Sequence, residues 1–350
     1  MRGSAVIVGA GIAGLAAARA LTAGGWDVEV HERHAQLSTA GTLLGLWPAA
    51  WAAFERLGAA ATLETVSIAS GELLRPDGRV LARLALPGTT RGVGRMDLLE
   101  TLLAGLPKGT VRWSSAVASP AGLPDADVVV AADGVHSALR ARAFPAARLR
   151  DAHVVAFRGV APLETVDGFE AWGAGLIFGR APFPGGGTNW YAGVRADLAG
   201  TREDDPLELL GALYRGWTPR VHEVLATLTP EAVDRRRIED LAPLKSYVAG
   251  NLALVGDAAH AMAPHLGRGG GESLMDGLAL ADALVAAPTV ADGLARYDAA
   301  RRRPSQRAVA GSRLMNRITN QLRHPWLRDT LATAAGKVAA RRRPAPSSAG

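Results

Sequence analysis

The opening of the chain alternates between short apolar runs and a helical pattern. The apolar run Ala5–Val8 predicts a buried strand, the alanine-rich stretch Ile12–Ala23 predicts the helix that follows, and Asp27–His31 predicts a second strand. Three glycines stand between the first strand and the helix in GxGxxG spacing, namely Gly9, Gly11 and Gly14. This order predicts a βαβ unit that holds the pyrophosphate of a dinucleotide at a helix N-terminus.

Glu32 ends the second predicted strand, about 20 residues beyond the glycines. A carboxylate in this place accepts hydrogen bonds from a ribose diol, which favours an adenosine ribose without a 2′-phosphate. NAD and FAD both remain open at this point. The structural alternative is an ordinary glycine-rich turn.

Beyond this unit the pattern changes several times. Helical periods cover 46–57, 96–105, 272–286 and much of 290–339. Strand-like pieces cover 66–95, with breaks expected at Asp77-Gly78 and Pro87-Gly88, as well as 126–131, most of 152–245 and 251–256.

These elements predict an α/β fold with a sheet domain inserted into a nucleotide-binding domain. We expect a discontinuous nucleotide-binding domain over residues 1–65, 96–150 and 246–300, and a β-sheet substrate domain over residues 66–95 and 151–245. A C-terminal helical segment over residues 301–340 and a disordered tail over 341–350 complete this division.

Composition narrows the class of protein. The 350 residues are 48% hydrophobic, which predicts a globular protein, and no run reaches the roughly 18 apolar residues of a membrane span. The net charge of +6 comes largely from arginine, including the runs 301–303 and 341–343, which we interpret as solvated basic faces; no nucleic-acid-binding motif accompanies them. The first strand follows Met1 closely, so we expect no signal peptide and a cytoplasmic location. The chain has no cysteine, and we expect no metal.

Two further motifs follow the predicted core strands. Asp133-Gly134 comes directly after a hydrophobic strand, and Gly256-Asp257 comes after another. The second motif continues into a loop rich in small residues that contains Pro264, Gly267, Gly269, Gly270 and Gly271. A loop with few side chains lets backbone N–H groups approach a flat ring, and the N-terminus of the next helix stabilises negative charge there.

In this order the three motifs resemble the fingerprints of the p-hydroxybenzoate hydroxylase-like FAD-dependent monooxygenases, the flavoprotein aromatic hydroxylases, over residues 4 to about 300. The resemblance implies a Rossmann-type FAD-binding domain of the GR2 type with an inserted β-sheet substrate domain. It places Asp133 at the pyrophosphate region, Asp257 at the ribityl hydroxyls, and Pro264 and the glycine loop beside the flavin ring. It also implies cofactor contacts for Arg33 and Arg95.

The resemblance further implies that NADH or NADPH reduces FAD as a transient donor, and that O2 then forms a C4a-hydroperoxyflavin that hydroxylates or epoxidises an aromatic or polycyclic small molecule. His265 is the candidate catalytic residue, because it follows Pro264 in the flavin loop and could hydrogen-bond a phenol or peroxide, with a purely structural histidine as the alternative. The candidate pocket residues are aromatic, with simple core packing as the alternative for each: Trp47, Trp172, Phe178 and Trp190.

The chain also departs from the family pattern. The family often has Gln followed by Gly-Ala-Asn in the flavin loop, where this chain has Arg268 and three glycines. Two alternatives therefore stay open, a flavin-dependent reductase or dehydrogenase of the same fold, such as a polyprenyl reductase, and a non-catalytic flavin-binding protein. We expect a monomer or a homodimer.

Overall fold

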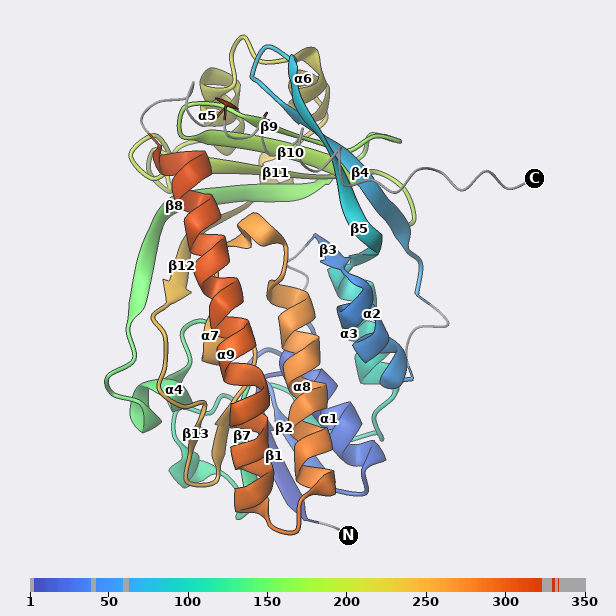
Figure 1. Ribbon diagram of the computed structural model, residues 1–350, viewed down its shortest axis with the longest axis vertical. Coiled ribbons are helices and arrows are strands. Elements are labelled where there is room, and N and C mark those ends of the chain that lie inside the picture. The colour runs from blue at the N-terminus through green and yellow to red at the C-terminus, as the bar shows by residue number, and fades with distance from the viewer. Residues whose placement is uncertain (1–2, 39–41, 59–62, 323–328, 331–332, 334–350) are drawn as a thin grey trace, which may run out of the picture. The chain divides into compact units, whose positions relative to one another are not determined.

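The computed structural model describes residues 3–38, 42–58, 63–322, 329–330 and 333, which form two compact units (Figure 1). Unit 1 comprises Met1–Thr65, Arg91–Ala152 and Ile238–Met315; unit 2 comprises Val66–Thr90, His153–Arg237 and Asn316–Gly350. Helix α9 (Val290–Asn316) crosses the predicted boundary at residue 300, so the start of the predicted C-terminal segment continues unit 1. The predicted tail over 341–350 lies outside the described residues.

Unit 1 contains a six-stranded sheet in the order β13-β14-β7-β1-β2-β6. All neighbours in this sheet pair in parallel except β13 and β14. The elements of this unit are β1 (Ser4–Val8), α1 (Ile12–Ala23), β2 (Asp27–His31), β3 (Leu43–Leu46), α2 (Pro48–Arg56), α3 (Arg95–Ala104), β6 (Val111–Arg112), η2 (Pro120–Gly122), β7 (Val128–Ala131), α4 (Ala138–Ala143), β13 (Val248–Ala249), β14 (Leu252–Leu254), α7 (Asp257–His260), η4 (Pro264–Leu266), α8 (Gly269–Ala286) and most of α9.

Unit 2 is built on antiparallel strands in the order β8-β11-β10-β9, with β4 joined to β9 in parallel. Its elements are β4 (Val66–Leu74), β9 (Phe169–Trp172), β10 (Leu176–Pro182), β11 (Thr188–Arg195), α5 (Pro206–Leu213), α6 (Pro219–Leu225), η3 (Pro230–Ala232) and the π-helix η5 (Arg317–Gln321). Strands β5 (Val80–Gly94), β8 (Leu149–Ala161) and β12 (Asp234–Leu241) contain residues of both units. The predicted α/β class with a second sheet is confirmed.

Two local predictions were wrong. Strand β5 continues through Pro87-Gly88, where a break is expected from the sequence. Helix α8 begins at Gly269 rather than at Glu272. The first turn of the helix thus includes the three glycines of the loop, despite the low helix propensity of glycine. Among the described residues no helix is both long enough and apolar enough to cross a membrane.

The core of unit 1 depends on the close approach of α1 and α8. Helix α1 is almost entirely buried and consists largely of alanine. A Cβ atom on Gly277 of α8 would lie 2.6 Å from the backbone nitrogen of Ala17 and 2.8 Å from the carbonyl oxygen of Ala13. Because backbone cannot move aside as a flexible side chain does, this crossing requires glycine at position 277.

The core of unit 2 is aromatic and lies between the sheet and helices α5 and α6. The Phe178 ring stacks on Phe169 and Trp190 and meets Tyr214 edge-on, with ring centroids 5.5–6.4 Å apart. The Tyr214 hydroxyl donates to the carbonyl oxygen of Ile177 at 2.8 Å, so its polar atom is satisfied inside the core.

We predict that Gly277→Ala destabilises the protein by about 1–3 kcal/mol, because the added methyl group would overlap the α1 backbone. The matched control is Gly211→Ala in α5, where an added Cβ meets nothing within 4 Å. Helix propensity alone favours alanine at both positions by about 0.5–1 kcal/mol. Urea unfolding of the three proteins measures the difference, and equal shifts for both variants would contradict the close crossing.

Candidate functional site

The predicted motifs meet at one edge of the unit 1 sheet. Strands β14, β7, β1 and β2 are adjacent and parallel, so their carboxyl ends lie side by side. These strand ends lead into Gly9, Glu32, Asp133 and Asp257. The chain runs from β1 to β2 on one side and returns after β6 to β7 on the other side of β1. Doubly wound sheets bind ligands at such a switch point.

The turn between β1 and α1 is shaped by its glycines. Gly9 has φ +108°, which disfavours any side chain, and its N–H donates to the carbonyl oxygen of His31 at 2.8 Å. A Cβ on Gly14 would lie 1.9 Å from the carbonyl oxygen of Gly9. A Cβ on Gly11, in contrast, would meet nothing within 4 Å. The N-terminus of α1 therefore has open space in front of it, which fits a pyrophosphate.

Glu32 is held in place by its neighbours. Its Oε2 accepts from the Ala10 N–H at 2.8 Å, and its Oε1 accepts from the N–H and the Nδ1 of His34 at 3.0 and 2.8 Å. Burial raises the pKa of Glu32, but these hydrogen bonds outweigh burial and the pKa is lowered. Glu32 is therefore an ionised acceptor beside the glycine turn. Arg33, which follows it, is exposed.

Asp133 and Arg140 link the middle motif to the late one. Asp133 Oδ2 accepts from the Leu139 N–H at 3.2 Å, whereas its Oδ1 is buried and has no partner within the described part of the chain. Such an acceptor fits a ligand that brings a donor. The buried Arg140 donates to the carbonyl oxygens of Val135 and Ala258, at 2.6 and 3.1 Å. The role of Arg140 was not predicted from the sequence, because nothing local distinguishes it from Arg142 in the same short helix.

The late motif contacts the first helix directly. Gly256 has φ +60°, and a Cβ there would lie 2.8 Å from the Cβ of Ala13 in α1. Asp257, the next residue, is exposed. Its carboxylate is thus accessible beside the turn that follows β1, as a contact to ribityl hydroxyls requires.

The glycine loop has an open part and a packed part. A Cβ on Gly267 or Gly269 would meet nothing within 4 Å. At Gly270 the nearest atom would be Leu44 Cδ2 at 3.1 Å, and at Gly271 it would be Trp47 Cζ3 at 2.4 Å. The open part leaves the backbone accessible to a ligand, while the packed part fixes the start of α8.

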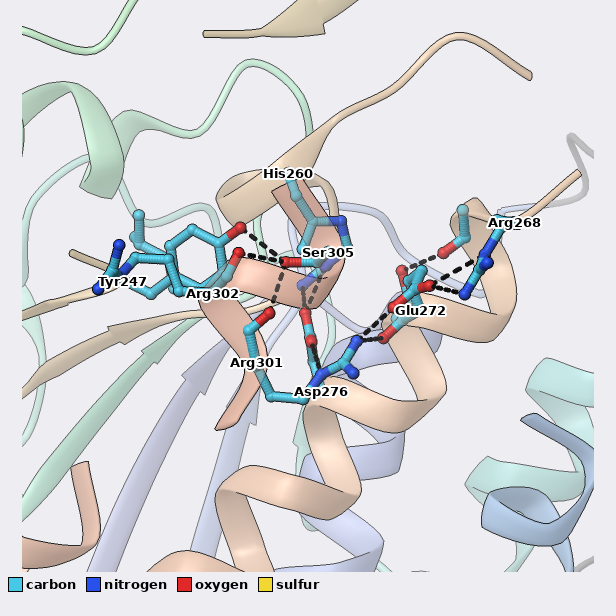
Figure 2. Close-up of polar contacts among 12 residues, drawn as sticks. Tyr247, His260, Arg268, Glu272, Asp276, Arg301, Arg302 and Ser305 are labelled. Carbon is cyan, nitrogen blue, oxygen red and sulfur yellow. Dashed lines mark hydrogen bonds and ion pairs between the residues drawn. The ribbon is translucent and has the colours of Figure 1, made fainter. Parts of the chain in front are cut away.

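Asp276 of α8 is the centre of a buried charge network (Figure 2). Its side chain is 0% exposed, and it accepts hydrogen bonds from the Gly256 N–H at 2.9 Å, His260 Nε2 at 2.6 Å and Arg301 Nε at 2.7 Å. Burial raises the pKa of Asp276, but His260 and Arg301 outweigh it and the pKa is lowered. The network therefore holds the Gly256-Asp257 turn against α8 and α9.

Glu272 extends the network to the glycine loop. It accepts from Arg301 at 2.5 Å and from Arg268 at 2.6 Å (Figure 2). The Arg268 guanidinium also lies 4.5 Å from the centre of the Trp47 ring. The interpretation of residues 301–303 as a solvated basic face was wrong for Arg301, which is buried because two carboxylates pair with it. Arg268, the departure from the family pattern, is the outer end of this network.

The remaining predicted residues fall into two groups. One group lies in or beside the loop segments of unit 1 and consists of Trp47, Arg95, Pro264 and His265. Arg95 begins α3, and its N–H donates to the Thr42 carbonyl oxygen. Burial lowers the pKa of His265 to about 4, so the imidazole is neutral at pH 7. Trp172, Phe178 and Trp190 lie in unit 2. Phe178 and Trp190 are completely buried in its aromatic core. For these two residues the alternative of simple core packing therefore applies.

We predict that Asp276→Asn destabilises the protein by about 3–5 kcal/mol, because it removes the carboxylate that pairs with the buried His260 and one of the two carboxylates that pair with the buried Arg301. Asp282→Asn is the matched control on the same helix, since Asp282 is half exposed and its one ion pair among the described residues is with the exposed Arg56. Its expected effect is below about 1 kcal/mol. Urea unfolding near neutral pH compares the two variants, and similar losses would show that the network adds no stability.

The network also predicts a pH dependence with two limbs. The stability from ionised Asp276 is present above its ordinary pKa of 3.8 and is lost as the pH falls through its lowered pKa. Burial lowers the pKa of His260, but the charge of Asp276 outweighs burial, and the pKa is raised. The stability from protonated His260 is therefore present below pH 6.5 and is lost as the pH rises through the raised pKa. Urea unfolding across both ranges should show a flatter profile for Asp276→Asn than for the parent protein.

Comparison with known proteins agrees with this geometry. A family model described as "FAD binding domain" matches residues 124–312, and one described as "NAD(P)-binding Rossmann-like domain" matches residues 7–42. The chain is 32% identical to 2-heptyl-3-hydroxy-4(1H)-quinolone synthase of Mycobacteroides abscessus, over 93% of this chain and 94% of that protein. It is 28% identical to aurachin C monooxygenase/isomerase of Stigmatella aurantiaca, over 89% and 88%.

A solved structure shows the same fold. Klebsiella pneumoniae HpxO, complexed with FAD and uric acid, superimposes with a TM-score of 0.84 at 23% identity, over 97% of this chain and 95% of that one. FAD, the cofactor that the family binds, fits three features of this site: the glycine turn, the accessible Asp257 carboxylate and the buried Oδ1 of Asp133. The chain therefore belongs to the p-hydroxybenzoate hydroxylase-like family of FAD-dependent monooxygenases.

Proposed function

We propose that this monooxygenase takes electrons from NADH or NADPH and uses O2 to hydroxylate or epoxidise an aromatic or polycyclic small molecule. The observation that carries the proposal is the meeting of Gly9–Gly14, Glu32, Asp133 and Asp257 at one sheet edge, with open space at Gly11. The names of the related proteins add support, because they refer to a quinolone, which is a fused aromatic ring system, and to uric acid. A cytoplasmic location and a monomeric or homodimeric state belong to the same proposal.

We assign the parts of FAD to residues by their chemistry. The N–H groups at the start of α1 would hold the pyrophosphate, and Glu32 would accept from the adenosine ribose. Asp257 would accept from the ribityl hydroxyls, and the open backbone at Gly267 and Gly269 would lie beside the flavin ring. When bound, FAD supplies the redox chemistry that carries electrons from the nicotinamide to O2.

The chain's own residues then orient the substrate and exchange a proton with it. His265 precedes the open glycines, and its neutral imidazole can accept a hydrogen bond from a substrate hydroxyl at pH 7. The positive end of the α8 dipole begins at Gly269 and stabilises negative charge in front of it. We propose His265 as the residue that hydrogen-bonds the substrate and the start of α8 as the electrostatic support.

The activity test uses the purified flavoprotein with NADH or NADPH and a panel of fused heteroaromatic compounds. A monooxygenase consumes O2 in a substrate-dependent way and places one atom of labelled oxygen in the product. Reduction of a substrate double bond under anaerobic conditions would instead identify the reductase alternative. Neither activity across the panel, with FAD bound, would favour the non-catalytic flavin-binding alternative.

We predict that Gly11→Ala weakens FAD binding by roughly 10- to 100-fold, the loss expected for one charge-assisted hydrogen bond. The new methyl group meets no protein atom, so the stability of the cofactor-free protein should stay unchanged. Gly122→Ala is the matched control, because an added Cβ there also meets nothing within 4 Å and lies outside the motif. Titration of the cofactor-free proteins with FAD gives both affinities, and equal values would contradict a pyrophosphate at this turn.

A further inference from the structure

The face of the unit 2 sheet opposite its aromatic core carries a polar row. Tyr191 on β11 pairs with Gly179 on β10, and Gly179 pairs with Glu170 on β9, so the three residues lie in line across three strands. Their sequence neighbours Phe178 and Trp190 point into the core, and side chains alternate along a strand. The row therefore lies on the other face.

Gly179 allows the two ends of the row to meet. A Cβ at this position would lie 2.2 Å from Tyr191 Cζ, so the phenol ring lies across the glycine. The Tyr191 hydroxyl reaches Glu170 and donates to Oε2. A direct hydrogen bond between residues two strands apart requires such a gap in the strand between them.

Trp172 gives Glu170 a second donor. It lies two residues along β9 on the same face, and its Nε1 donates to Oε1 of Glu170. Burial raises the pKa of Glu170 above its ordinary value, and the hydrogen bonds from Tyr191 and Trp172 offset only part of that rise. Within the described residues Glu170 has no ion-pair partner, so the carboxyl group is held by neutral donors alone. We call Glu170, Trp172 and Tyr191 the Glu170 cluster.

The neighbouring cation is already neutralised. Arg158 on β8 pairs with Tyr191 in the next position of the row. Its guanidinium binds Asp234 of β12 at 2.9 Å, so the charge is paired with a carboxylate on the other side. The described part of the row therefore presents an acidic group and the Tyr191 ring, and no unpaired cation in it attracts an anionic ligand.

This chemistry selects a ligand. A carboxylate has about four lone-pair positions, and Tyr191 and Trp172 occupy two of them. Tyr191 is 36% exposed, Glu170 is half-buried and Trp172 is buried, so a ligand reaches the cluster from the Tyr191 side. A flat ring with an N–H group complements it, because the Tyr191 ring offers a stacking surface and the carboxylate accepts a hydrogen bond from the N–H. A ring carboxylate would meet like charge.

We propose that the Glu170 cluster is a substrate subsite that binds a planar heteroaromatic ring through its N–H group and disfavours ring carboxylates. The proposal rests on the proposed function, since it assigns the substrate class of the same monooxygenase to the β-sheet unit. Glu170 is then a specificity-determining residue, and Gly179 is the residue that makes the cluster possible.

The test compares three probes on the flavin-loaded enzyme by isothermal titration calorimetry: 4(1H)-quinolone, its N-methyl derivative and salicylate. The parent enzyme should bind the N–H quinolone roughly tenfold or more tightly than the N-methyl compound, as expected for a hydrogen bond to a charged group. In Glu170→Gln this ratio should fall toward one, and salicylate should bind more tightly than it does to the parent. The N-methyl compound reports whether the variant remains folded, because its binding needs no N–H contact.

Glu223→Gln is the matched control, since Glu223 belongs to α6 on the opposite side of this sheet and pairs with Arg180. It should leave the quinolone ratio at the parent value. An unchanged ratio in Glu170→Gln, with O2-dependent oxygenation of the probes intact, would overturn the subsite and leave the proposed function standing. Failure of every probe to bind or to stimulate O2 consumption would overturn both.

Discussion

The candidate site depends on one buried carboxylate. Asp276 joins three segments that are distant in the chain, because it accepts from Gly256 before α7, from His260 at the end of α7 and from Arg301 in α9. Removing these charges from water costs several kcal/mol for each ion, and only mutual pairing offsets this cost. The arrangement is therefore stable in one geometry, and that geometry sets the turn that carries Asp257. The buried charges of Asp276, His260 and Arg301 therefore fix the position of Asp257 at the edge of the sheet.

The motifs at the cofactor edge were predictable because each depends on local backbone geometry. Gly9 needs a positive φ, Gly14 cannot carry a Cβ, and strand, turn and helix follow one another within a few residues. A single sequence contains all of that information. The second sheet was predictable as well, because the pattern between residues 152 and 245 changes its period.

Long-range partners were not predictable in the same way. Arg301 stands in a run of arginines, and nothing near it in the chain indicates that Asp276 and Glu272 bury it. Phe178 lies on a strand whose first five residues are all buried, so the sequence does not show which face meets the core. The row from Tyr191 to Glu170 depends on strand register, which is decided by tertiary pairing and not by local preference.

The three-part composition of unit 1 has a consequence for synthesis on the ribosome. Its first segment supplies β1 and α1, but β14, which pairs with β7, and α8, which covers α1, come from residues after 237. Until that last segment has emerged, the apolar face of α1 has no α8 to cover it and β7 lacks a neighbour on one side. Since domains fold as units during synthesis, this one completes its core only when most of the chain has been translated, and unit 2, contained mainly in residues 153–237, precedes it.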